Sequence, residues 1–116
     1  MKKKADQQSS YRVMAEYASS GIWLIKQQGV FRHSGVSWSY LKLPTALSDQ
    51  FSTWIDYYNS KLNFNNTDNF DVEAFNEEGL RLATELKRFL GDRSSVEFQG
   101  ELESGGLLDP VPIEVA

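Results

Sequence analysis

Few residues in this sequence could do chemistry. The chain has one histidine, His33, and no cysteine, which excludes thiolate sites and multi-histidine metal sites. His33 is followed by Ser34, the one place where a base and a nucleophile meet. Adjacent side chains rarely reach the geometry that Ser–His catalysis requires. A loop or interface role is therefore the favoured interpretation of His33, and a small hydrolase or transferase that uses it remains an alternative.

The acidic residues between positions 68 and 78 have structural explanations. Paired carboxylates catalyse when they face each other across a cleft with separated pKa values. Glu73, Glu77 and Glu78 instead fall in the first turns of a predicted helix, where negative charge complements the helix dipole. The stretch DNFD at 68–71 lacks the ligand spacing of a calcium loop. We predict no catalytic residue, no metal site and no cofactor.

A second acidic pattern lies in residues 95–103. Apolar and polar residues alternate there, which predicts a half-buried strand. The predicted exposed face carries Glu97, Gln99, Glu101 and Glu103 at intervals of about 7 Å, two residues of strand rise. Such a line could be a solvated face that protects a sheet edge. It could equally bind a cationic protein surface.

The segment 30–43 is rich in aromatic residues and contains an arginine. We interpret it as a long ordered loop with at most one short strand, at residues 36–40. Aromatic and arginine side chains are the types that interface hot spots use, but they could also form a satellite core under the loop. Both alternatives stay open. The residues concerned are Phe31, Arg32, His33, Trp38 and Tyr40.

Among the elements that must position these residues, the helix predicted at 70–91 has the clearest sequence signals. Asp71 is a predicted N-cap, Lys87 and Arg88 suit the last turn, and Gly91 suits the helix exit. Gly79 lies within the apolar stripe of this helix, which predicts close packing against a neighbour. A second helix is predicted from Pro44 to about residue 62, and strands are predicted at 11–18 and 22–25.

The predicted fold class is α+β. The elements are expected to form a small antiparallel sheet in the order β-β-α-α-β, with two helices packed on one face. We expect a flexible N-terminal arm at 1–10, one domain at 11–103 and a C-terminal tail at 104–116.

Charge is unevenly distributed along the chain. The net charge is −4. Residues 1–47 hold seven cations and two carboxylates, whereas residues 48–116 hold five and fourteen. This field disfavours nucleic acid and attracts a basic partner. The sequence shows no apolar run long enough to span a membrane and no signal-peptide pattern, which predicts a cytoplasmic protein without membrane association.

Several stretches resemble small bacterial immunity proteins, the cognate partners of polymorphic toxins that include contact-dependent growth inhibition systems. The stretches are YASSGIW (17–23), VFRHSGVS (30–37), FSTWIDYYN (51–59), VEF (96–98) and the helix at 70–91. The resemblance implies tight, stoichiometric binding of a toxin domain without catalysis, and many such toxins are nucleases with basic clefts. It supplies no contact residues.

Charge and exposure therefore give the predicted contacts with the toxin. Glu97, Glu101 and Glu103 would supply an attractive field. The predicted anchors and loop contacts are Trp38, Tyr40, Asp56, Arg32 and His33. A homodimeric scaffold that pairs through the aromatic loop is a further alternative.

Overall fold

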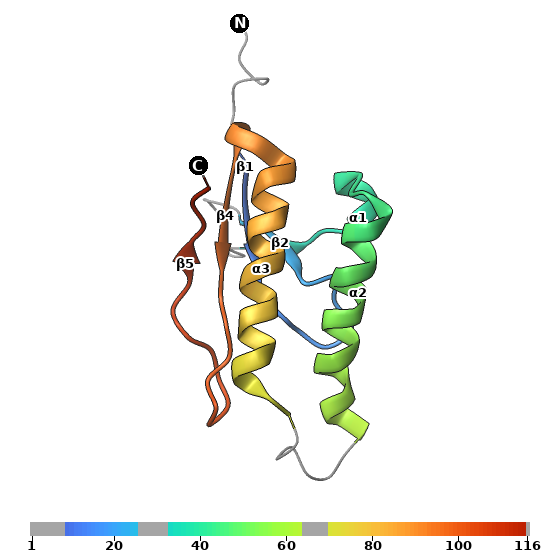
Figure 1. Cartoon of the computed structure of the whole chain (residues 1–116), viewed down its shortest axis with the longest axis vertical. Coiled ribbons are helices and arrows are strands. Elements are labelled where there is room, and N and C mark those ends of the chain that lie inside the picture. Colours follow the sequence, from blue (N-terminus) through green and yellow to red (C-terminus); the bar gives the residue numbers. More distant parts are fainter. Residues whose placement is uncertain (1–8, 26–32, 64–69, 116) are drawn as a thin grey trace, which may run out of the picture.

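The computed structural model describes residues 9–25, 33–63 and 70–115. These residues form a five-stranded sheet with the two long helices on one face (Figure 1). The α+β class and the placement of both helices on one face are confirmed. The sheet order is β3-β2-β1-β4-β5. Its strands are β1 (Ser9–Val13), β2 (Ile22–Ile25), β3 (His33–Gly35), β4 (Ser94–Phe98) and β5 (Val111–Pro112).

The sheet is mixed, so the predicted wholly antiparallel arrangement is wrong at one pair. β1 runs antiparallel to β2, but it runs parallel to β4, with Ser9 opposite Ser94 and Val13 opposite Phe98. Helix α3 (Val72–Leu90) delivers the chain to the end of the sheet where β1 begins. β4 must therefore run in the direction of β1. Apolar alternation within a strand carries no information on this direction.

Helix α3 forms as the sequence predicts. The carboxylate of Asp71 accepts a hydrogen bond from the Ala74 N–H at 3.0 Å, and the helix ends at Gly91 with φ of 78°. On the surface of α3, Arg81 forms an ion pair with Glu78 at 2.7 Å. Arg81 also donates to Gln50 of the neighbouring helix, which draws its side chain toward Glu78.

Helix α2 (Thr45–Asn59) continues into the 3-10 turn η2 (Ser60–Asn63), in agreement with the predicted helix from Pro44 to about residue 62. The close packing predicted at Gly79 is confirmed. A Cβ atom there would lie 2.6 Å from Trp54 Cζ2 of α2 and 2.5 Å from Phe98 Cε1 of β4. The core lies between the helices and the sheet and includes Val13, Ile22, Phe51, Trp54, Ile55, Phe75, Leu82, Leu86, Val96 and Phe98.

Two local predictions are wrong. The strand expected at residues 36–40 is instead a short helix, α1 (Trp38–Leu41), because the Ser37 side chain accepts from the Tyr40 N–H at 3.0 Å and caps it. The first strand ends at Val13 rather than at residue 18, since a turn follows it. Of the predicted N-terminal arm, residues 9 and 10 belong to β1, and residues 1–8 lie outside the described part. Within the predicted tail, β5 pairs with β4.

Candidate partner-binding site

The predicted line of free carboxylates on β4 and beyond does not exist. Glu97 is paired with Arg12 Nε at 2.5 Å, and Arg12 also donates to Gln99 at 3.2 Å. Glu101 is buried, with 7% of its surface exposed, and its carboxylate lies 3.6 Å from Lys61 Nζ. Only Glu103 is exposed as expected. Whether any of these residues contacts a partner stays a prediction, but they do not form a continuous acidic surface.

Gly100 explains why Glu101 is buried rather than exposed. A Cβ atom at Gly100 would lie 2.9 Å from Asn76 Oδ1 of α3. The same Asn76 side chain bonds both the N–H and the C=O of Glu101, at 2.9 and 3.0 Å. The chain is thereby drawn against α3, and the strand alternation stops after Phe98. A glycine inside an alternating strand pattern is the sequence signal that could have indicated this close approach.

The Glu101 carboxylate belongs to an internal cluster. Burial raises the pKa of Glu101, and the ammonium group of Lys61 opposes this shift. Burial also raises the pKa of Tyr58 to about 12, with a smaller contribution from Glu101. Lys61 Nζ lies 4.3 Å from the centre of the Tyr58 ring and 4.7 Å from that of Phe70. This cluster ties η2 to the segment after β4, so we assign it a structural role.

The residues of the predicted aromatic loop separate into core and surface. Trp38 is half-buried against the core and donates its indole N–H to the Ser20 carbonyl at 3.0 Å. Tyr40 is 66% exposed, and Asp56 is exposed on α2. His33 pairs with Ile25 through β3, and its side chain lies outside the described part, as does Arg32. The structure therefore leaves Tyr40 and Asp56 as accessible candidates.

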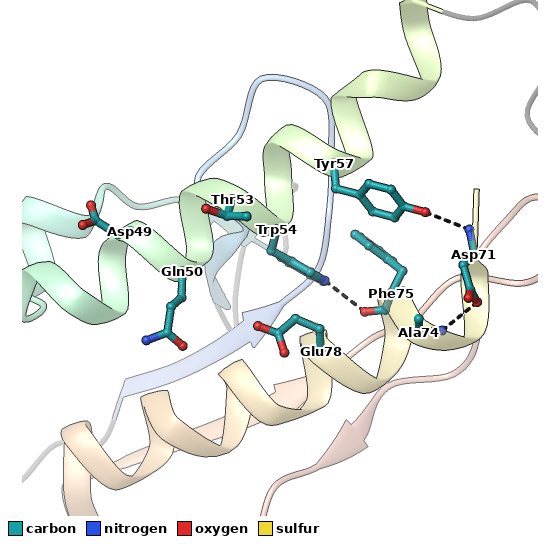
Figure 2. Close-up of a pocket in the computed structure, with 9 residues that line it drawn as sticks. All are labelled: Asp49, Gln50, Thr53, Trp54, Tyr57, Asp71, Ala74, Phe75 and Glu78. Carbon is teal, nitrogen blue, oxygen red and sulfur yellow. Dashed lines mark hydrogen bonds between the residues drawn. The ribbon is translucent and has the colours of Figure 1, made fainter. Parts of the chain in front are cut away.

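A groove of about 600 Å³ lies between α2 and α3. Figure 2 shows the side chains that line it. The ring of Trp54 stacks on that of Phe75, with centroids 4.7 Å apart and planes at 8°. The indole N–H of Trp54 donates to the Phe75 carbonyl at 3.0 Å. The lining residues are Asp49, Gln50, Thr53, Trp54, Tyr57, Asp71, Ala74, Phe75 and Glu78.

Two hydrogen-bonded bridges fix the separation of α2 and α3 along this groove. The Asp71 N–H, just before α3, donates to the Tyr57 hydroxyl at 2.9 Å (Figure 2). Further along the helices, Arg81 donates to Gln50 at 2.5 Å and to Glu78 at 2.7 Å. Because both helices are bridged on either side of the stacked rings, the groove is formed before any partner arrives.

The charges around the groove favour a cation. Asp49, Asp71 and Glu78 line it. The hydrogen bond from Arg81 lowers the pKa of Glu78 and keeps it ionised at neutral pH. Trp54 and Phe75 are buried, so the aromatic surface open to a partner is the ring of Tyr57, which is 40% exposed. An exposed ring beside carboxylates suits the aliphatic stem and charged head of a lysine or arginine. The sequence prediction named only Asp56 in this region. The signal it missed is the row Asp49, Thr53 and Tyr57, spaced four apart along one side of α2.

Two other features were sought among the described residues, a metal site and a membrane-spanning helix. Within residues 9–25, 33–63 and 70–115, no three His, Cys, Asp or Glu side chains are placed to hold a metal ion. No helix in that part of the chain is long and apolar enough to cross a bilayer.

A family model described as Serratia CdiI immunity protein-like matches residues 9–101. The chain belongs to this family. The resemblance to immunity proteins of contact-dependent growth inhibition systems is thereby confirmed. The part matched to the CdiI-like family includes β1 to β4 and both helices of the groove. Beyond the match lie β5 and the hairpin segment at residues 102–110, whose turn is closed by the bridge between Glu101 and Leu107. A search of curated proteins found no match to this CdiI-like chain.

Proposed function

We propose that this chain binds a cognate toxin domain stoichiometrically and neutralises it by covering a basic surface, without catalysis of its own. Membership of the CdiI immunity family is the observation that carries this proposal. The excess of carboxylates in residues 48–116, fourteen against five cations, supports a basic toxin such as a nuclease. The site of action would be the cytoplasm, where a nuclease finds its substrate.

The groove between α2 and α3 is the proposed seat for one lysine or arginine of the toxin. Its walls are prearranged by the two bridges, so binding would order few side chains. A cation over an aromatic ring contributes about 0.5–2 kcal/mol, depending on how far it is desolvated. The carboxylate of Asp49, exposed on α2, would add long-range attraction that speeds encounter more than it strengthens the final complex.

The test uses a candidate toxin domain purified with and without this chain. We expect a one-to-one complex by light scattering and loss of toxin activity in that complex. Thr53 is exposed on α2 and lines the groove. Thr53→Arg should weaken toxin binding at least about tenfold, because the arginine side chain would fill the groove and repel a cation. Calorimetry or biolayer interferometry would measure this.

Ser95→Arg is the matched control. Ser95 is exposed on β4 and the substitution adds the same charge far from the groove. It should leave the affinity almost unchanged. Weakening by Ser95→Arg but not by Thr53→Arg would place the toxin on the open face of the sheet and reject the groove. Toxin that stays active in the presence of excess wild-type protein would reject the proposed function itself.

A further inference from the structure

A second surface lies on the other side of α3, where aliphatic side chains are exposed. Leu80 of α3 is 44% exposed, Leu108 is 43% exposed and Val111 of β5 is 46% exposed. They line a hollow of about 310 Å³ together with Phe98 and Gly100. We call this surface the leucine face. Its acidic border consists of Glu73, Glu77 and Asp109.

The backbone holds these side chains outward. The Leu108 N–H donates to the Gly100 carbonyl at 2.9 Å, and the Gln99 side chain donates to the Leu108 carbonyl at 2.8 Å. The Ile113 N–H donates to the Val96 carbonyl at 2.8 Å, and Ile113 itself is buried. The hairpin is thus attached on both sides of Leu108. Clustered aliphatic exposure on an ordered surface is typical of a protein-binding site.

The carboxylates of the leucine face lack compensation. Glu78 and Glu85, elsewhere on α3, are each paired with an arginine at 2.7 Å. Glu73, Glu77 and Asp109 have no ion pair among the described residues. The sequence also has no lysine or arginine after Arg93. The face therefore combines apolar area with free negative charge, which complements an apolar patch bordered by lysine or arginine.

The negative charge of the leucine face favours a basic partner over a second copy of this chain. A second copy docked on the same face about a two-fold axis would oppose carboxylates with carboxylates. Like charges placed together at an interface weaken the complex. A basic partner meets no such cost.

We propose that the leucine face is the second part of the toxin footprint and takes an aliphatic, lysine- or arginine-bordered patch of the toxin. This inference rests on the proposed function. Ala74 and Glu78 of α3 line the groove, whereas Glu73 and Glu77 border the leucine face. One partner can therefore straddle the N-terminal half of α3 and contact both.

The apolar part of the proposal is tested with Leu80→Ser combined with Leu108→Ser. Dissociation of the toxin complex should become about 10- to 100-fold faster, because interface substitutions act mainly on the dissociation rate. Phe89→Ser is the control, since Phe89 is also on α3 and 42% exposed but lines a different hollow. Its dissociation rate should stay within about threefold of the wild type. Circular dichroism melts should confirm that all variants fold.

The electrostatic part is tested with Glu77→Gln against Glu85→Gln. Both remove one charge from α3, but only Glu85 is paired with an arginine. Glu77→Gln should slow association more than Glu85→Gln does and reduce its salt dependence.

The outcomes separate the two proposals. If the wild type binds toxin and the double serine variant binds equally well, the leucine face is not part of the footprint while the proposed function stands. If the wild type is a dimer that the double variant converts to monomer with unchanged toxin binding, the face belongs to self-association and the inference is overturned. If the wild type binds no toxin, the function and the inference fall together.

Discussion

Gly79→Ala offers the sharpest test of how α3 packs. Alanine in an open helix position is more favourable than glycine by about 1 kcal/mol. At position 79, however, the new methyl group would lie 2.5 Å from Phe98 Cε1 and 2.6 Å from Trp54 Cζ2. Both rings are buried, at 6% and 3% exposure, and Trp54 is further held by its hydrogen bond to Phe75. Neither ring can move aside without displacing other core residues.

Inserting an extra methyl or methylene group into a well-packed core costs about 1–3 kcal/mol of stability. We therefore expect Gly79→Ala to lower the free energy of unfolding by about that amount, and Tm by about 4–12 °C for a domain of this size. Urea denaturation followed by tryptophan fluorescence would measure the change. An increase in stability by about 1 kcal/mol, the helix-propensity gain alone, would refute the close approach of α2, α3 and β4.

A double-mutant cycle supplies the control. Phe98→Leu shortens one of the two contacting rings and costs stability by itself. Combined with Gly79→Ala, it should recover at least about 0.5 kcal/mol relative to the sum of the two single changes, because the residues are in direct contact. Strict additivity would show that the strain arises elsewhere.

Two further predictions concern stability. Burial raises the pKa of Glu101, so the folded state disfavours the ionised carboxylate, and the stability that the protonated carboxyl contributes is lost as pH rises through that raised pKa. Glu101→Gln should therefore raise Tm at pH 8 relative to the wild type and lose this advantage near pH 4. An equal difference in Tm at both pH values would contradict the assignment. Asp71→Ala removes the side-chain cap of α3 and should cost about 1 kcal/mol in urea denaturation, with Asp71→Asn as the control that retains most of the stability.

Local signals in the sequence predicted α3 almost to the residue. Asp71, Gly91 and the apolar stripe each act within one or two turns, so they need no knowledge of the rest of the chain. The same holds for the close approach at Gly79. The parallel pairing of β1 with β4 could not be obtained this way, since the two strands are separated by α2 and α3, and neither strand encodes the direction of its neighbour.

Contacts between distant segments also determine which carboxylates are neutralised and where the groove forms. Glu97 and Glu101 have the spacing of an exposed row, but Arg12 and Lys61, from distant segments, neutralise them. Conversely, the groove exists because Tyr57 and Gln50 of α2 meet Asp71 and Arg81 across the helix pair. Spacing along one element predicts which residues share a face. It does not predict which other element will cover that face.

The double hydrogen bond from Asn76 to the Glu101 backbone has a consequence for how this protein can change. It fastens the chain to α3 at the residue where the match to the family ends, and Ile113 is the next buried apolar residue after it. Substitutions between these two attachment points fall on exposed positions and leave the core intact. The segment 102–112 can therefore vary in sequence with little effect on the core, because both of its ends are held independently of its own side chains.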